Sequence, residues 1–326
     1  MNFDLHAAHA ALEDAIHHLP LYGTPAELYD PMRYIMSLGG KRMRPMLVLL
    51  GKYAVTGTWQ DVVQPAIAVE MFHNFTLMHD DIMDRAPLRR GRATVHKKWD
   101  ENVALLSGDA MLVKTYQQWL ETVPPGFLLG LLKRFCQIAV QVCQGQQMDM
   151  NFEARKRVTM KEYLEMIRMK TAVLIGFSLE AGARLGHASE ETLDQLYHFG
   201  ELLGIGFQLK DDLLDVYGQP DKFGKLMGGD IIANKKTFLL VRALELANAM
   251  QMRELDYWLT VEEFDPQTKV DAVKEIYDQL AIKEHTENAM NEYFEKAFAT
   301  LEQVAILPER RQVLREFARA IIERDQ

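Results

Sequence analysis

The stretch AIAVEMFHNFTLMHDDIMD, residues 66–84, is an apolar run that ends in three aspartates. Its apolar residues recur at spacings of three and four, which predicts a helix. They cover most of its faces, which is typical of a helix buried inside a large α-helical assembly. At about 100° per residue, Asp80 and Asp84 lie about 40° apart and one turn from each other, and Asp81 lies about 100° from Asp80. The spacing therefore predicts that all three carboxylates converge at one inward-facing end of the helix.

Such carboxylates need cations, because burying an unpaired charge is costly. Mg²⁺ is a suitable partner, since it binds one or two carboxylates and fills its other positions with water and phosphate. A DDxxD pattern also occurs at solvated helix ends, so this cluster alone leaves a surface role open. The pattern recurs, however, in FQLKDDLLD at residues 207–215, where Asp211, Asp212 and Asp215 follow a second apolar run. The repetition favours two metal-binding clusters.

Bulk composition is that of a soluble globular protein with a sizeable core. The 326 residues are 48% hydrophobic and 25% charged, and the net charge of −9 argues against nucleic acid and anionic membranes as partners. We find no signal peptide and no apolar run approaching the roughly 18 residues of a membrane span. Cys136 and Cys143 form neither a disulfide framework nor a zinc pattern, and we expect both thiols to be buried on one side of a helix. The sequence predicts a cytoplasmic protein without stable membrane insertion.

Nearly every long segment has helical periodicity, including residues 164–185. Thr24 with Glu27, and Thr159 with Glu162, have the spacing of a capping box at a helix start. Glycine and proline breakers separate the segments, and no linker or repeat divides the chain. We predict one all-α domain over residues 1–326.

Basic residues accompany both acidic clusters. GGKRMRP (39–45) contains glycines that let backbone N–H groups approach an anion, and LRRG (88–91) follows the first cluster. Lys170 lies in an apolar helix, where it needs a charged partner. Each basic residue alone could be a solvated side chain, but their joint placement favours phosphate binding through metal and bidentate arginine. We therefore interpret residues 76–96 as a metal and phosphate site rather than as a direct salt-bridge cluster.

The motifs together resemble those of the trans-isoprenyl diphosphate synthases, or polyprenyl synthetases. They appear in family order between about residues 30 and 240: GGKRMRP, HDDIMD with LRRG, GQQMD, MKTA, FQLKDDLLD, FGK and GGDIIANKKT. The resemblance implies about a dozen packed helices around a deep central cavity, usually in a homodimer. It also implies head-to-tail condensation of isopentenyl diphosphate with an allylic diphosphate.

Roles carried over from the resemblance fall into groups. The residues expected to contact three Mg²⁺ ions on the allylic diphosphate are Asp80, Asp84 and Asp211. Those expected to support them through waters and hydrogen bonds are Asp81, Asp212 and Asp215. Direct contacts to the allylic diphosphate are expected from Arg89, Lys170 and Lys225. The residues expected to bind isopentenyl diphosphate are Lys41, Arg44, His73 and Arg90, and a further substrate-binding residue is Lys235. The two side chains expected beside the developing cation are Thr171 and Gln208.

Product length is linked in this family to the residues ahead of the first DDxxD. Phe75 and Thr76 stand five and four positions before Asp80, which resembles short-chain enzymes that make C20, with C15 next. An ideal helix places Phe75 about 140° from Asp80, so this role rests on the resemblance. A longer-chain polyprenyl synthase remains an alternative, as do a terpene cyclase and a non-catalytic synthase subunit. The DDLLD sequence and the GGKRMRP loop argue against a cyclase, and the complete set of expected ligands argues against an inactive subunit.

Overall fold

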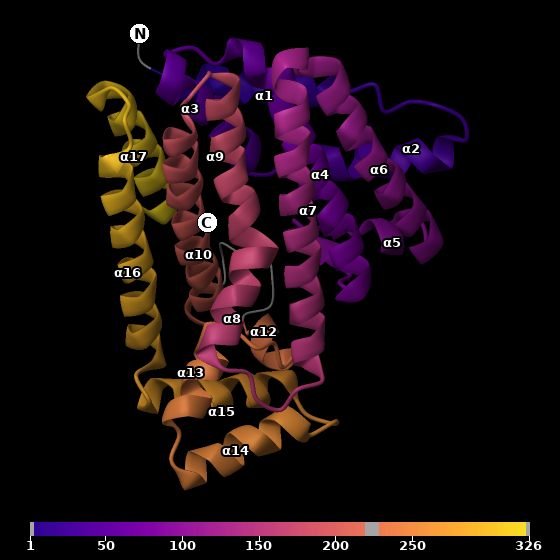
Figure 1. Cartoon of the computed structure of the whole chain (residues 1–326). Coiled ribbons are helices and arrows are strands. Elements are labelled where there is room, and N and C mark those ends of the chain that lie inside the picture. The colour runs from indigo at the N-terminus through magenta and orange to yellow at the C-terminus, as the bar shows by residue number, and fades with distance from the viewer. Residues whose placement is uncertain (1–2, 219–227, 324–326) are drawn as a thin grey trace. The chain divides into compact units, whose positions relative to one another are not determined.

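The computed structural model describes residues 3–218 and 228–323, and helices dominate them (Figure 1). The predicted all-α fold class is confirmed. The chain divides into two compact units. The first unit comprises Met1–Gln137, Phe177–Tyr197 and Gln303–Arg315, and the second comprises Ile138–Gly176, His198–Glu302 and Glu316–Gln326. The proposal of a single domain over residues 1–326 stays a prediction.

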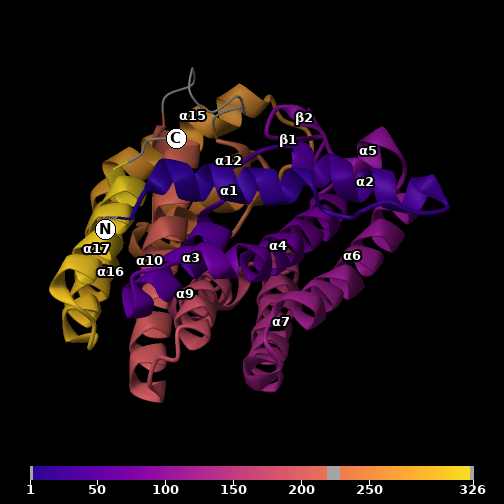
Figure 2. The ribbon, with the colours of Figure 1, turned by 90° about the horizontal axis from the view of Figure 1, so that it is seen from above.

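The first unit is built largely from helices of the N-terminal part of the chain. These are α1 Leu5–His17, α2 Ala26–Ser37, α3 Met43–Thr56, η1 Gln60–Val62, α4 Val63–Met83, α5 Val95–Lys98 and α6 Glu101–Thr122. The apolar α4 packs against α3 and α6 (Figure 2), which buries most of its length as predicted. A short antiparallel hairpin, β1 Leu88–Arg89 and β2 Arg92–Ala93, follows α4.

Glycines allow the backbone of α3 to touch that of α9, Val173–Leu185. A Cβ at Gly182 would lie 1.9 Å from Val48 O, and a Cβ at Gly51 would lie 2.2 Å from Leu179 O. Both distances are far shorter than van der Waals contact, so only glycine permits this approach.

The second unit contains most of the remaining elements. These are α8 Met160–Ile167, the π-helical turn η2 Arg168–Ala172, α12 Gly229–Ile232, α13 Phe238–Leu246, α14 Ala249–Thr260 and α15 Pro266–Gln279. The elements that contribute residues to both units are α7 Pro125–Glu153, α9, α10 Glu190–Tyr217, α16 Ile282–Gln303 and α17 Pro308–Glu323. In the second unit α14 and α15 lie side by side (Figure 1).

Helix starts agree with the sequence at one capping box and not at the other. Thr159 Oγ1 accepts from Glu162 N at 3.3 Å, and Glu162 returns a carboxylate oxygen to Thr159 N at 2.9 Å. At Thr24 no such box forms, because Pro25 is itself the N-cap of α2 and no side-chain hydrogen bond caps the helix. The periodic segment 164–185 is helical as predicted, but a π-helical turn, η2, separates α8 from α9 within it.

Helix α7 contradicts two sequence-based expectations. Cys136 and Cys143 are exposed, so the prediction of buried thiols is wrong. By length and composition α7 could also cross a membrane, although we expected no such run. Only 28% of its most apolar window is buried by the chain, and Leu129 and Val140 are exposed on it. The apolar residues of α7 therefore extend over a face that the described part of this chain leaves uncovered.

Candidate active site

The first acidic cluster lies at the C-terminal end of α4, as predicted. Asp80 and Asp81 belong to its last turn, and Asp84 is the C-cap, whose N–H donates to Asp80 O at 2.8 Å. The three side chains differ in environment: Asp81 is buried, Asp80 is partly buried and Asp84 is exposed. The spacing predicted that all three carboxylates face inward. Asp84 does not, because α4 ends before it.

The β1–β2 hairpin brings Arg89 to this cluster. Arg90 and Gly91 form its two-residue turn with φ of 52° and 74°, the left-handed conformations that match the twist of a two-residue hairpin. Arg89 Nε then donates to both oxygens of Asp81 at 2.9 Å, and its Nη2 lies 2.7 Å from Asp81 Oδ1. The same Nη2 lies 3.6 Å from Asp80 Oδ2. Asp81 and Arg89 thus form a direct ion pair, whereas our interpretation of the sequence favoured a metal and phosphate site over direct salt bridges.

Burial and pairing act against each other in this ion pair. Burial raises the pKa of Asp81, and the hydrogen bond and charge of Arg89 reduce that rise without cancelling it. Burial alone would lower the pKa of Arg89, but the hydrogen bond and charge of Asp81 outweigh it and leave the pKa raised. Arg89 therefore compensates a buried carboxylate, and its own side chain is 23% exposed.

The four residues predicted to bind isopentenyl diphosphate all belong to the first unit, and three of them meet at the loop that precedes α3. Arg44 Nη1 lies 3.0 Å from His73 Nε2 on α4. Arg90 donates to Gly39 O. A Cβ at Gly40, whose φ is +135°, would lie 2.8 Å from the Arg90 guanidinium carbon. The fourth residue, Lys41, is exposed on the same loop.

His73 is neutral in this basic environment. Burial lowers its pKa well below the usual value, and the charges of Arg44, Arg90, Arg89 and Arg42 lower it further. A neutral His73 can accept a hydrogen bond from Arg44 at Nε2. The loop therefore presents guanidinium groups without adding a charged imidazole.

The second acidic cluster lies near the C-terminal end of α10, and its second aspartate is buried like that of the first cluster. Asp211 is exposed and Asp212 is buried. Asp212 accepts hydrogen bonds from Tyr163 Oη at 2.6 Å, Phe238 N at 2.9 Å and Gln208 Nε2 at 3.2 Å. Protein donors thus hold the buried second aspartate of each DDxxD, while the first aspartate is less buried in both clusters.

Asp215 connects this cluster to α12. Its Oδ2 accepts from Asp230 N at 3.0 Å, and its backbone oxygen accepts from Gly228 N at 2.8 Å. The carboxylate therefore binds the N-terminal end of a helix, where backbone N–H groups favour negative charge. The role of Asp215 in supporting bound Mg²⁺ stays a prediction.

Lys170 and Thr171 lie in the π-helical turn, a distortion that is frequent at functional sites. Lys170 Nζ lies 2.6 Å from Asp149 Oδ2, which supplies the charged partner that the sequence required. Thr171 Oγ1 donates to Gln208 Oε1 at 3.2 Å. Because Gln208 Nε2 is bound to Asp212, its amide oxygen is directed to the Thr171 side.

Gly145→Ala is expected to lower kcat about 10²-fold, as small displacements of catalytic groups do. The added Cβ would lie 2.2 Å from Lys170 N, so the π-helical turn would have to shift. Gly130→Ala on the same helix is the matched control, since its Cβ would meet nothing within 4 Å. Steady-state kinetics and thermal unfolding check the pair. An unchanged kcat in a folded Gly145→Ala protein would contradict the predicted shift of Lys170.

In metal-free protein, the free energy of unfolding should fall as the pH rises from about 4 to about 6. Burial raises the pKa of Asp212 to about 6, against the hydrogen bonds from Tyr163, Phe238 and Gln208. Since an unfolded aspartate titrates near pH 3.9, the folded protein binds more protons within this window. The stability carried by the protonated form is present below the window and lost through it.

The expected loss is about 3 kcal/mol. Urea unfolding with a chelator at several pH values measures it, and Asp212→Asn should remove this part of the slope. An identical slope in the variant would show that another group is responsible.

A pocket with an empty volume of about 470 Å³ adjoins the second cluster. The predicted site residues that line it are Lys170, Thr171, Gln208, Asp212 and Lys235. It also contains Lys236, which the prediction did not include. Lys225 lies outside the described residues, so its predicted role stays a prediction.

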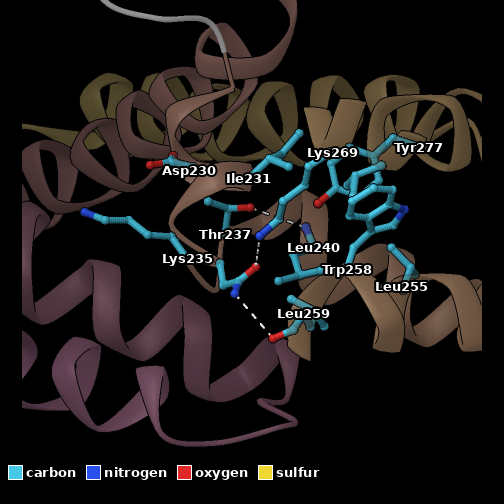
Figure 3. Close-up of a pocket in the computed structure, with 12 residues that line it drawn as sticks. Asp230, Ile231, Lys235, Thr237, Leu240, Leu255, Trp258, Leu259, Lys269 and Tyr277 are labelled. Carbon is cyan, nitrogen blue, oxygen red and sulfur yellow. Dashed lines mark hydrogen bonds between the residues drawn. The ribbon is translucent and has the colours of Figure 1, made fainter. Parts of the chain in front are cut away.

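A second pocket shares Asp230, Lys235 and Thr237 with the first and has an empty volume of about 300 Å³ (Figure 3). Lys269 Nζ there donates to Asn234 Oδ1 at 2.7 Å, and Asn234 Nδ2 donates to Leu259 O at 3.3 Å. Lys235 extends away from these side chains (Figure 3). The hydrogen bonds of Lys269 and Asn234 therefore hold in place the backbone segment that carries Lys235.

The donor chemistry of both clusters fits Mg²⁺. Within residues 3–218 and 228–323, no three His, Cys, Asp or Glu side chains gather closely enough to enclose a metal ion. Mg²⁺ does not require such a cage, since one or two carboxylates with water and phosphate satisfy it. Asp80, Asp84 and Asp211 offer such carboxylate oxygens at partly or fully exposed positions.

Several residues that complete the site were not predicted. Asp149 belongs to the GQQMD motif and could have been found there. Tyr163 and the backbone N–H of Phe238 reach Asp212 from distant parts of the chain. No local pattern marks either one, because only tertiary packing brings them to the carboxylate.

Comparison with known proteins gives consistent matches over most of the chain. The family model described as Polyprenyl synthetase matches residues 25–280. A geranylgeranyl pyrophosphate synthase of Geoglobus acetivorans is 37% identical over 302 residues, which cover 92% of each protein. A crystal structure of geranylgeranyl pyrophosphate synthase covers 100% of both chains with a TM-score of 0.93 and 41% identity. A crystal structure of geranylgeranyl pyrophosphate synthase from Corynebacterium glutamicum, complexed with isoprenyl diphosphate and magnesium, covers 99% of this chain and 100% of that chain, with a TM-score of 0.87 and 27% identity.

Proposed function

The chain belongs to the polyprenyl synthetase family, and from this premise we propose that it joins isopentenyl diphosphate head to tail to an allylic diphosphate. The enzyme is a prenyltransferase that makes short-chain all-trans prenyl diphosphates. We favour a C20 product, with C15 next. The observation that carries the proposal is the basic set at the α3 loop, comprising Lys41, Arg44, His73 and Arg90. A terpene cyclase has no second diphosphate to hold and no need of such a set.

The allylic diphosphate binds to metal and to basic side chains. Asp80, Asp84 and Asp211 would hold three Mg²⁺ ions. Bound Mg²⁺ would supply positive charge that stabilises the departing diphosphate. Arg89 and Lys170 contact the diphosphate oxygens directly, and Lys225 joins them. Charges of this kind, held in place before ionisation, would stabilise the growing negative charge without reorganisation.

The allylic cation is stabilised by oxygen dipoles. Thr171 and Gln208 are fixed relative to each other by a 3.2 Å hydrogen bond, and Asp212 holds the amide of Gln208 through its other end. The double bond of isopentenyl diphosphate, held by the basic loop, attacks the cation. The proton then leaves to the departed diphosphate, so no histidine or glutamate base is required.

The test is incubation of the pure protein with Mg²⁺, isopentenyl diphosphate and allylic primers of five, ten and fifteen carbons, followed by sizing of the products. We expect chains that stop mainly at C20 and no product with a chelator. Absence of diphosphate release with every primer would support the non-catalytic alternative and contradict the proposal.

Phe75→Ala is expected to lengthen the product, because it removes a ring that is nearly buried ahead of the first aspartates. Phe75 is 8% exposed, and its ring centroid lies 5.6 Å from that of Phe72 and 4.9 Å from that of His79. Phe75→Leu should lengthen the product less, since it removes less volume. Chromatography of the dephosphorylated products checks both variants, and an unchanged product spectrum would count against this role.

We also propose that the active protein is a homodimer that uses α6 and α7. Leu106, Val113 and Leu120 recur every seven residues on α6 and are each more than half exposed, so they form one apolar stripe. Leu129 is similarly exposed on α7. Exposed apolar surface of this kind marks an interaction site, and a second copy would cover it. For this reason we assign the protein to the cytoplasm rather than to a membrane.

Val113→Glu tests the dimer, with Met250→Glu on α14 as the control at a similarly exposed apolar residue. The side chains are 68% and 71% exposed. Sedimentation should give a dimer for the wild type and for Met250→Glu, and a monomer for Val113→Glu. A monomeric wild type, or a dimeric Val113→Glu protein, would contradict the assignment.

A further inference from the structure

Arg42 stands among the predicted isopentenyl diphosphate residues but is directed into the protein. Lys41 beside it is exposed, whereas Arg42 is 3% exposed. Arg42 is also the N-cap of α3, and its φ of 44° is left-handed. That conformation is unfavourable for a long side chain and persists only where its surroundings hold it.

Three partners hold the Arg42 guanidinium. Its Nε donates to Glu13 Oε1 at 2.8 Å, its Nη1 to Glu70 Oε1 at 2.7 Å, and its Nη2 to Met36 O at 2.7 Å. Burial alone would lower the pKa of Arg42, but the hydrogen bonds and charges of Glu13 and Glu70 raise it overall. Glu13 and Glu70 therefore compensate the buried positive charge of Arg42. Removing either carboxylate would leave that charge only partly compensated.

The carboxylate partners come from two different helices. Glu70 lies on α4, one turn before His73, and is 2% exposed. Asn74 Nδ2 donates to its Oε1 at 3.1 Å and so fixes the carboxylate. Glu13 lies on α1, and its side chain is 40% exposed. The N-terminal helix thus contributes one of the two charges that hold the loop.

Other contacts complete the anchoring of this loop. Arg90 donates to Gly39 O, and Arg44 contacts His73. Arg42 anchors the middle of the segment, between the glycines and Arg44. Its loss would free the backbone that carries Lys41 and Arg44.

We propose that Arg42 is a positioning residue for isopentenyl diphosphate, and that Glu13 of α1 makes the N-terminal helix part of that binding site. The inference rests on the proposed function of Lys41, Arg44, His73 and Arg90. Arg42 itself does not touch the substrate. It holds the loop backbone so that its two neighbours meet the diphosphate in a fixed arrangement, which lowers the ordering cost of binding.

Glu13→Gln is the test, because its side chain is partly exposed and the change keeps its shape. Asp14→Asn, the same change at the adjacent exposed carboxylate of α1, is the matched control. We expect Glu13→Gln to raise KM for isopentenyl diphosphate about 3- to 10-fold, which lies within the range found for residues that act on a site indirectly. KM for the allylic diphosphate should stay near that of the wild type, and thermal unfolding checks that the variant is folded at the assay temperature. Asp14→Asn should change neither KM.

Calorimetric titration with isopentenyl diphosphate alone gives a second readout that needs no turnover. The Kd should rise in Glu13→Gln by the same factor as KM. Any other pattern, such as equal changes in both KM values or no change in either, would overturn the positioning role. If the wild type neither turns over nor binds isopentenyl diphosphate, the proposed function itself fails, and that result is distinct from an active wild type with an unaffected Glu13→Gln variant.

Discussion

Asp80→Asn should lower kcat/KM about 10³-fold or more while the protein remains folded, a loss at least as large as that from removing one transition-state ligand. Asp80 is partly buried at the end of α4, and its Oδ2 lies 3.6 Å from Arg89 Nη2, whereas Asp81 is held by hydrogen bonds from Arg89. The amide keeps the shape of the side chain but removes the negative charge that Mg²⁺ requires. The effect should therefore be one of chemistry and metal affinity.

Steady-state kinetics over a range of Mg²⁺ concentrations, with unfolding curves for each protein, measure this effect. Asp194→Asn is the control, since Asp194 is exposed on α10 outside both acidic clusters. Its kinetics should match those of the wild type. If Asp80→Asn retains activity within about tenfold of the wild type, Asp80 is not a required metal ligand.

Arg89→Met should lower the free energy of unfolding by about 3 kcal/mol. Asp81 is 1% exposed, and Arg89 donates to both of its oxygens at 2.9 Å. Removing Arg89 leaves a buried carboxylate without its cation, and the loss should be greatest where Asp81 is ionised. Activity should also fall about 10²-fold or more, because the direct contact to the diphosphate that we propose for Arg89 would be lost.

The double variant Asp81→Asn with Arg89→Met separates these two effects. Stability should recover, since the buried charge is gone, whereas activity should not. Urea unfolding of the metal-free proteins and steady-state kinetics test the set. If the double variant is no more stable than Arg89→Met alone, the uncompensated charge of Asp81 is not the cause of the loss.

Local sequence patterns predicted the helices well where the pattern and the packing agree. The apolar periodicity before the first cluster predicted a buried helix, and α4 is one. At Thr159 the capping box forms with both hydrogen bonds, whereas at Thr24 the next residue, Pro25, takes the N-cap position. The π-helical turn at residues 168–172 was not predicted, because one wider turn hardly changes apolar periodicity.

The sequence predicted which acidic and basic residues form the candidate site, but not which of them pair with each other. Motifs identified the acids and bases of both clusters, yet the structure pairs Asp81 with Arg89, Lys170 with Asp149, and Asp212 with Tyr163. These partners depend on tertiary packing. The exposed thiols of α7 have a similar origin, because apolar character predicts burial without saying whether this chain or another supplies the cover.

The central claim, head-to-tail condensation, is tested most directly by the stoichiometry of diphosphate release. Purified protein is given Mg²⁺, labelled isopentenyl diphosphate and an allylic primer, and diphosphate is quantified together with the mass of the product. We predict one diphosphate released for each isopentenyl diphosphate consumed, with products that grow by five carbons at each step and keep their own diphosphate. Diphosphate release from the allylic primer without consumption of isopentenyl diphosphate would contradict the claim.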